Sequence, residues 1–492
     1  MRITRTTQSL LAALGVLAVA LGIAEVNPPS GEAAASGRTV RTAVAHRAVL
    51  CPNPLQSGSA STGYAVAAPG APAGVSVASG SSGSGGTAGA GRLGPLGGAG
   101  TALAQLSATG GATAGKAPSG AKAPALALTA DGGLAPGLTG QQTTVLDGGK
   151  SLSGLSCTEP ATDFWFAGAD TAKGDTDTLV LSNNESTNAY VDVQAFGATG
   201  EVESTQAGNI SVPADGSVAL PLSRLVNAAG SGGVVSLHVL VRSGRVAAAL
   251  NADSGSTGAD WIPPTELSST VVLPGLPGDV KHAVLAVTAP GVEDADLKLQ
   301  LASQTGWITP AGHETIHVKA GMLTFVDLAD VTRGQPAALR LSPTDPKQAP
   351  GVVAAIQLGR GSSSTELAYT TGTDAVTQRT TIAGNTAAGT TLFLTATDKA
   401  ATVTVAALGK SGSPQTQEVK LQPGTTVAIK PKSPDGADGY ALTVEPAAGS
   451  GPVYVARMLT SGKAGFTVQP YADDHSTVEV PRTIQAPAIL LP

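Results

Sequence analysis

One motif recurs in this 492-residue chain and constrains its fold more than any other feature. It consists of a short apolar run that contains alanine, a polar break of glycine and serine, and then one large aromatic residue. The copies are Val246–Trp261, Val352–Tyr369 and, more loosely, Val453–Phe466. Because self-similarity along a chain indicates repeated structural units, the sequence predicts three similar domains in series.

Each repeat is predicted to be a β-sandwich. Only 3% of the residues are aromatic and 13% are charged, so the cores must be built from small and branched apolar side chains. Branched residues favour pleated sheets, and short apolar segments punctuated by Gly, Asn and Asp are typical of sandwiches. We therefore expect an all-β chain of tandem immunoglobulin-like β-sandwiches at 161–273, 274–376 and 377–482, followed by a tail at 483–492.

The first 36 residues have the features of an export segment. Arg2 and Arg5 precede the apolar run Leu10–Ala24, and small-residue cleavage sites follow it. The run is long for a signal peptide and short of the about 20 residues that span a membrane. The sequence therefore predicts that residues 1–36 contact the membrane, as a cleaved signal or as an uncleaved anchor. The rest of the protein is expected to be extracytoplasmic, either secreted or anchored to the cell membrane.

Residues 37–160 are expected to form an N-terminal β-region with a flexible insertion at about 79–119. The insertion is rich in Gly, Ala and Ser, which bury too little apolar surface to offset the entropy lost on ordering. Both cysteines of the chain, Cys51 and Cys157, lie in this region. Behind an export signal, such a pair predicts a disulfide. The alternatives are two unrelated buried thiols and, for the whole region, a disordered stalk.

The segment His313-Glu314-Thr315-Ile316-His317 matches the HExxH signature of zinc proteases. That chemistry needs a helix, which brings both histidines to one face. Alignment with the other repeats instead places Thr315–Val318 on a strand, where four residues span about 13 Å. We therefore predict no metal site and no cofactor. A zinc hydrolase acting through His313 and His317 is the least favoured of the functions that we consider.

No catalytic residues are predicted elsewhere. Gly110–Lys116 has the spacing of a phosphate-binding loop, but Ala117 stands where Ser or Thr should bind magnesium. Trp165, Trp261 and Trp307 are candidate ligand contacts through sugar stacking, although anchoring of the core is the favoured interpretation in a chain with so few aromatic residues. The net charge is −6 and no basic patch is evident, so no nucleic-acid partner is expected.

Several segments resemble an uncharacterised family of secreted or membrane-anchored actinobacterial proteins, a domain of unknown function. The resembling residues are Leu50–Pro52, Cys157, Phe164–Gly168, Leu179–Asn183 and Ala259–Trp261, within a resemblance over roughly residues 47–482. It implies work at the cell envelope and carries over no catalytic residue. We therefore expect a non-enzymatic extracytoplasmic scaffold that binds an envelope glycan or protein. A carbohydrate-binding accessory of a cell-wall glycosyltransferase is the alternative.

Overall fold

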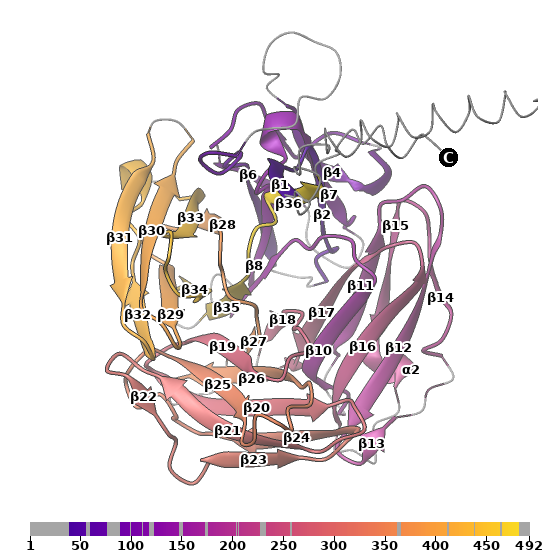
Figure 1. Ribbon diagram of the computed structural model, residues 1–492. Coiled ribbons are helices and arrows are strands. Elements are labelled where there is room, and N and C mark those ends of the chain that lie inside the picture. Colours follow the sequence, from indigo (N-terminus) through magenta and orange to yellow (C-terminus); the bar gives the residue numbers. More distant parts are fainter. Residues whose placement is uncertain are drawn as a thin grey trace, which may run out of the picture. The chain divides into compact units, whose positions relative to one another are not determined.

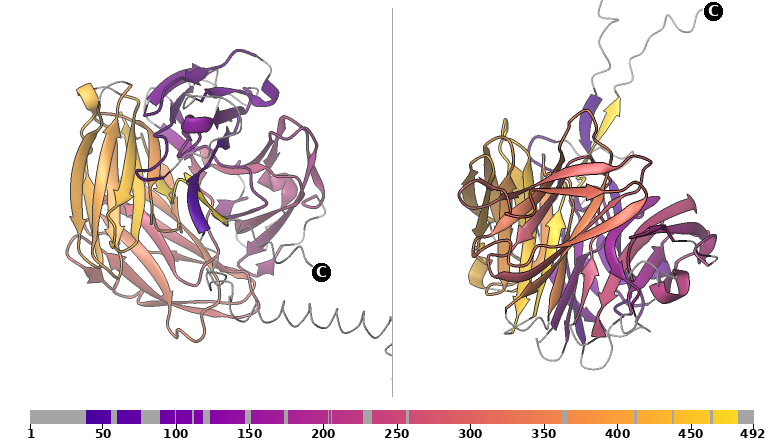
Figure 2. Two further views of the ribbon diagram at one scale, coloured as in Figure 1. Left: turned by 45° about the horizontal axis from the view of Figure 1, so that its top comes forward. Right: turned by 90° about the horizontal axis from the view of Figure 1, so that it is seen from below.

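The computed structural model describes residues 39–481, except for 56–59, 76–88, 99, 111, 118–122, 147–150, 173–175, 203, 205, 227–232, 256–257, 362–365, 411–412, 437 and 463–464. The expected export segment and tail lie outside these residues. Residues 43–477 form one compact unit, and the described parts of 1–42 and 478–492 belong to a second. The strands β1 (Thr39–Ala43) and β36 (Thr477–Pro481) pair with each other (Figure 2).

The compact unit contains four β-sandwiches that share one strand order. When the eight main strands of a sandwich are numbered along the chain, one sheet has the order 1-6-3-4 and the facing sheet has the order 5-2-7-8. The two facing sheets are plainest in the fourth sandwich, drawn in orange to yellow (Figure 1). Each sandwich buries an apolar core between its sheets. The all-β sandwich fold predicted from the sequence is therefore confirmed.

The elements follow one another in chain order. Sandwich I contains β2 (His46–Cys51), β3 (Ser61–Ala67), β4 (Gly91–Pro95), β5 (Ala104–Leu106), β6 (Ala112–Ala117), β7 (Leu126–Asp131), β8 (Thr139–Leu146) and β9 (Ser151–Ser156). Sandwich II contains β10 (Asp163–Asp170), β11 (Thr178–Asn183), β12 (Ala189–Gly197), β13 (Gly200–Glu201), β14 (Ile210–Val212), β15 (Gly216–Pro221), α2 (Leu222–Leu225), β16 (Val234–Ser243), β17 (Ala247–Asp253) and β18 (Ala259–Ile262). Sandwich III contains β19 (Val271–Leu276), β20 (Val280–Ala289), β21 (Ala295–Ala302), β22 (Trp307–Ile308), β23 (Thr315–Val318), β24 (Met322–Asp327), β25 (Ala337–Pro343), β26 (Val353–Arg360) and β27 (Leu367–Thr371). Sandwich IV contains β28 (Thr380–Asn385), β29 (Thr390–Ala396), β30 (Ala401–Leu408), β31 (Gln415–Leu421), β32 (Thr425–Ile429), β33 (Tyr440–Pro446), β34 (Val453–Ser461) and β35 (Gly465–Tyr471).

The strand order differs from that of an immunoglobulin domain. Both arrangements pair the second strand with the fifth and the third with the sixth. In an immunoglobulin domain the first strand then pairs with the second and the seventh with the sixth. Here the first strand pairs with the sixth and the seventh with the second. The immunoglobulin-like part of the expectation is therefore not confirmed.

Sandwich I corrects two expectations, the count of three repeats and the flexible insertion at 79–119. The strands β4, β5 and β6 fall within that segment. Leu93, Ala104 and Leu106 from this segment are buried in the core of sandwich I, and β4 pairs along β7. Backbone pairing satisfies the polar groups of a glycine-rich strand whatever its side chains. A few well-placed leucines are then enough for the core, which composition averaged over 41 residues conceals.

Within a sandwich, alternation along each strand separates core from surface. In β21 the side chains of Leu297, Leu299 and Leu301 are buried, whereas Asp296 and Lys298 between them are exposed. Successive side chains of a strand point to opposite faces of its sheet. The period-two pattern of the sequence therefore sets which face of β21 meets the core.

A glycine in the first strand of sandwiches II, III and IV sets how consecutive sandwiches pack. Gly168, Gly275 and Gly384 each have a positive φ and lie in a bulge of that strand. A Cβ atom on Gly275 would lie 2.7 Å from the Cβ of Ala456 in sandwich IV. The corresponding neighbours are Ala286 of sandwich III for Gly168, and Ala65 of sandwich I for Gly384. The bulge glycine thus lets each first strand approach the sheet of order 5-2-7-8 in another sandwich, which we call the inner sheet.

Candidate functional site

The eighth strands of the four sandwiches pack against one another, and we call this meeting point the junction. It consists of β9, β18, β27 and β35, each packed against two of the others. In Figure 1, β18 and β27 are labelled next to each other. Since each strand is the edge of its own inner sheet, the junction gathers side chains that lie far apart in the sequence.

Asp260 of β18 is the central polar residue of the junction. It is 0% exposed. Its Oδ1 accepts hydrogen bonds from the backbone N–H of Gly154 at 3.0 Å and from the hydroxyl of Thr467 at 3.1 Å. Burial raises the pKa of Asp260 well above its usual range, and the charge of Glu366 acts in the same direction. One carboxyl group of sandwich II therefore joins strands of sandwiches I and IV.

Glu366 brings sandwich III into the same polar centre. It directly precedes β27 and is 8% exposed. Burial raises the pKa of Glu366 to about 7, while the neighbouring Ser151 side chain and the backbone of Leu152 act in the opposite direction. The junction thus holds two carboxyl groups that burial keeps from ionising as readily as they would in water.

Arg457 is the buried cation of sandwich IV and is 0% exposed. Its guanidinium donates to the backbone oxygen of Ala383 at 2.5 Å, to Asn385 Oδ1 at 3.3 Å and to Gln469 Oε1. Burial lowers the pKa of Arg457. All three acceptors are neutral, so the arginine orders β28, β34 and β35 without an ion pair to any described residue.

A second polar cluster ties sandwich IV to sandwich I. Arg379 Nε lies 2.7 Å from Asp474 Oδ2, with both side chains almost completely buried. Arg379 Nη2 also donates to the backbone oxygen of Gly70 in sandwich I at 2.8 Å. Arg47 of sandwich I donates to the backbone oxygen of Asp474 and forms an ion pair with Glu159 at 2.6 Å. The buried charged groups of this cluster therefore hold sandwiches I and IV together.

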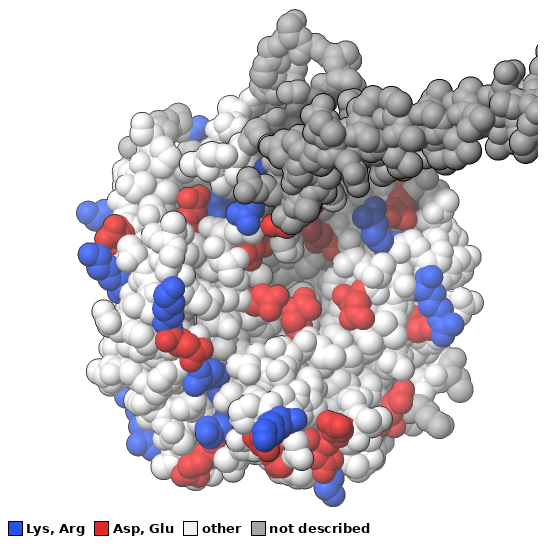
Figure 3. Space-filling view, viewed as in Figure 1, with Lys and Arg blue, Asp and Glu red and all other residues white. Residues whose placement is uncertain are grey.

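A cavity of about 290 Å³ opens where the four junction strands end. Its walls are mainly apolar and include Leu155, Trp261 and Pro263, while Glu266, Asp374 and His475 line it as well. The last three are exposed, so they belong to the mouth. On the face viewed in Figure 3, a hollow lies between the sandwiches and acidic side chains border it. All four sandwiches contribute to this cavity.

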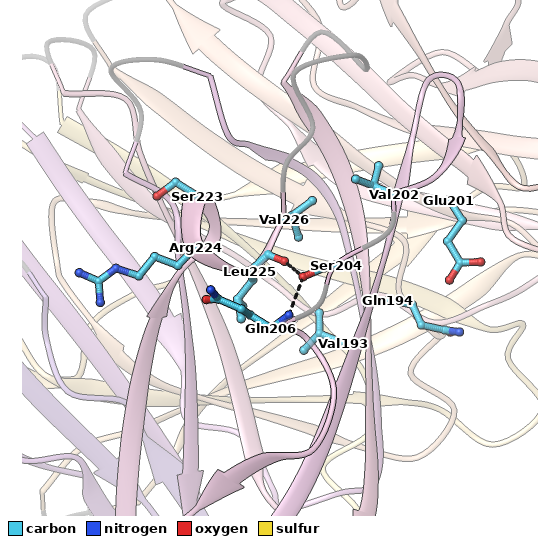
Figure 4. A pocket seen from close by; sticks show the side chains of 10 residues that line it. All are labelled: Val193, Gln194, Glu201, Val202, Ser204, Gln206, Ser223, Arg224, Leu225 and Val226. Atoms are coloured by element: carbon cyan, nitrogen blue, oxygen red, sulfur yellow. Dashed lines mark hydrogen bonds between the residues drawn. The ribbon is translucent and has the colours of Figure 1, made fainter.

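A second, more open depression of about 610 Å³ lies on sandwich II, between β12, β13 and α2. Figure 4 shows Arg224 and Glu201 extending from opposite sides of it, with Ser204 between them. The Ser204 hydroxyl donates to the backbone oxygen of Leu225 and accepts from the N–H of Gln206. The central hydroxyl of this depression is committed to the backbone, and the junction cavity is the more enclosed and more apolar of the two. The junction cavity is therefore the better candidate site.

The structure places the predicted disulfide where the sequence analysis expects it. Cys51 and Cys157 are bonded to each other, and both lie in the core of sandwich I. The bridge joins the end of β2 to the residue after β9. The disulfide prediction is therefore confirmed.

The three tryptophans lie at boundaries between sandwiches. Trp165 stacks on His238 with ring centroids 3.8 Å apart and packs on residues of sandwich III. Trp307 is half-buried beneath the guanidinium of Arg340, 4.0 Å from its ring centroid. Trp261 is 1% exposed and forms part of the cavity wall. The structure therefore brings only Trp261 to the candidate site.

The HExxH segment lies away from this cavity, on sandwich III. Thr315–Val318 forms β23, which confirms the predicted strand. His317 Nδ1 lies 2.8 Å from Asp296 Oδ1, and its Nε2 lies 3.5 Å from Asp294 Oδ2. His313 lies before the strand, in the turn that follows Pro310. Among the described residues, no three His, Cys, Asp or Glu side chains are grouped closely enough to hold a metal ion.

A family model matches residues 114–432, from sandwich I to sandwich IV, and its description is a family of unknown function, DUF5719. The chain belongs to this family. The match covers more than half of the chain but a shorter span than the resemblance suggests. No curated protein matches the chain. Across the described part of the sequence, no helix has the length and apolar character needed to cross a membrane.

The junction and the mouth of its cavity do not follow from the sequence. Asp260 belongs to a segment that carries the family resemblance, whereas no sequence pattern marks Glu366, Glu266 or Asp374 as site residues. One available signal was the position of Asp260 and Glu366, since each lies at the start of the aromatic-bearing strand of a repeat. An acidic residue at the same point of two repeats interrupts the apolar pattern around it, which indicates a functional or strained position.

Proposed function

We propose that this protein is a non-enzymatic extracytoplasmic scaffold of an actinobacterial cell envelope, which presents a rigid surface to an envelope glycan or protein. The observation that carries the proposal is the polar interlocking of the four sandwiches through Asp260 and the Arg379–Asp474 pair. Domains joined only by linkers move relative to one another by default. Buried contacts between them favour a single stiff body, which suits a structural or binding role.

The location outside the cytoplasm has separate support from the disulfide. A buried bridge between Cys51 and Cys157 is stable in an oxidising compartment, and such bridges are rare in the cytosol. The expected export segment, residues 1–36, points the same way but lies outside the described residues.

The test is capture of partners from intact envelopes. A tagged full-length protein is crosslinked in cells, recovered from fractionated envelopes and analysed by mass spectrometry. We expect the protein in the envelope fraction, with oxidised cysteines and with a reproducible set of wall or membrane partners. Recovery in the cytoplasm with reduced cysteines contradicts the proposal. Hydrolysis of peptidoglycan or arabinogalactan by the purified protein contradicts the non-enzymatic part.

A carbohydrate-binding accessory is the second candidate, and the junction cavity favours it because an indole and two carboxylates line one concavity. Carboxylates accept hydrogen bonds from sugar hydroxyls. Glycan arrays discriminate the two candidates. Trp261→Ala is a poor probe because it would empty a buried site, whereas Glu266→Gln with Asp374→Asn changes exposed groups only. Loss of a glycan signal in that double variant would support this candidate over a protein-binding scaffold.

A further inference from the structure

The fourth strand of sandwich IV leaves a long sheet edge without a partner. β31 is the last strand of its sheet and pairs with β30 along its whole length, from Gln415 to Leu421. Among the described residues, no strand pairs with its other edge. Figure 1 shows β31 at the outer rim of the molecule, away from the junction. The unpaired N–H and C=O groups of such an edge are a template for a further strand.

The corresponding edges of the other sandwiches are short or broken. The fourth strand has three residues in sandwich I (β5) and two in sandwiches II and III (β13 and β22), against seven in sandwich IV. In sandwiches II and III a separate short strand, β14 or β23, pairs with the same third strand farther along. Short and interrupted edge strands protect a sheet against pairing with other chains. Within the part of the chain that the structure describes, sandwich IV therefore lacks a protection that its three counterparts have.

Two opposite charges on β31 determine which pairings this edge can make. Glu418 and Lys420 lie on the solvent face of the strand, with 60% and 75% of their side chains exposed. Val419 between them points into the core of sandwich IV. The neighbours of the two charged residues on β30 are Thr404 and Thr402, which are uncharged. The Glu418 carboxylate lies 3.6 Å from the Lys420 ammonium, and no other described side chain forms an ion pair with either.

We propose that two copies of this protein associate through β31, as antiparallel neighbours in one continuous sheet. A two-fold axis perpendicular to the sheet keeps both cores on the same side, and opposite residues then share a face. Centring the axis on Val419 places Glu418 of each copy opposite Lys420 of the other. Centring it on Glu418 or on Lys420 would instead place like charges directly opposite each other, which is destabilising.

The register centred on Val419 favours a second copy over a strand of another protein. The order of charges along β31 is complementary to itself when the strand is reversed, so both copies gain the same cross-strand ion pairs. Pairing from Gln417 to Leu421 would also satisfy outward backbone groups of the edge, and Val419 of one copy would lie beside Val419 of the other. The inference goes beyond the scaffold role and does not depend on it.

The test is sedimentation velocity of the full-length protein over a range of concentrations, in which the wild type should dimerise as its concentration rises. Glu418→Lys and Lys420→Glu should each weaken the dimer by about tenfold, because each replaces two attractive pairs across the axis with repulsive ones. An equimolar mixture of these two variants should dimerise again, because each chain then meets the opposite charges of the other. The double variant Glu418→Lys/Lys420→Glu should dimerise as the wild type does.

A matched control, Glu293→Lys, makes the same change of charge at an exposed position of sandwich III and should leave the dimer unchanged. Hydrogen exchange of β31 should be slower at high protein concentration than at low. A monomer at every concentration, a dimer that the two charge variants do not weaken, or a mixture of them that stays monomeric would each overturn the proposal. Slower exchange of β31 only when an envelope partner is added would assign the edge to another protein and also overturn it. Partner capture from envelopes does not depend on self-association, so failure here leaves the scaffold proposal standing.

Discussion

Replacing Gly275 by alanine should loosen the packing between sandwiches III and IV. The residue has φ +90, and its added Cβ would lie 2.7 Å from the Cβ of Ala456 and 2.9 Å from a methyl group of Val468. A side chain in the left-handed region costs roughly 1–2 kcal/mol. Overpacking of a tight interface adds typically about 1–3 kcal/mol. We therefore expect the variant to lose about 2–5 kcal/mol of stability.

A matched variant separates the two effects. Gly321 also has a positive φ, +69, but nothing lies within 4 Å of the position of its Cβ. Gly321→Ala should therefore show only the backbone cost, roughly 1–2 kcal/mol. The assay is urea unfolding, with hydrogen exchange of β19, β34 and β35 as a local measure. Faster exchange of these strands in Gly275→Ala, but not in Gly321→Ala, is the expected result. Equal losses in the two variants would refute the role of Gly275 in the interface.

Three further changes test other parts of the molecule. The pKa of about 7 for Glu366, against an ordinary 4.5, means that the native protein keeps a proton that the unfolded chain has lost between these pH values. Its stability contribution therefore falls as pH rises from about 4.5 to 7, by roughly 3 kcal/mol, and Glu366→Gln should remove this fall in urea titrations from pH 4 to 8. Cys51→Ser/Cys157→Ser should cost up to about 4–5 kcal/mol because the bridge closes a long loop, with a lower unfolding midpoint that reductant no longer changes. Arg379→Ala should cost about 3–5 kcal/mol because it leaves the Asp474 carboxylate buried and unpaired, and calorimetry should show no such loss for Arg333→Ala, whose side chain is exposed.

The secondary structure was predictable where a local pattern of residues indicates a strand. The alternation in β21 and the apolar runs of the three repeats correctly indicate strands. The same reasoning correctly rejects a helix for Thr315–Val318. It failed for β4, β5 and β6, because these short strands lie in a segment rich in glycine, alanine and serine and carry too few large side chains for a pattern to be detected. It also failed for the strand order, which depends on pairings between residues distant in the sequence.

The candidate site was less predictable than the fold. The sequence drew attention to Trp261 and to the Cys51–Cys157 pair, and both lie at structurally important places. It gave no reason to group Glu266 with Asp374, which are separated by more than 100 residues. Their relation arises only because the eighth strands of different sandwiches converge.

The sequence by itself determines that this chain is all-β and that three of its four sandwiches repeat, since alternation, turn residues and a recurring motif are local. The tertiary structure alone decides how the four units combine. Three bulge glycines allow close approach, and Asp260 finds its partners on two other sandwiches. The physical reason is that the effect of a buried carboxyl group or a missing Cβ depends on neighbours from other sandwiches, and no local pattern in the sequence specifies those neighbours.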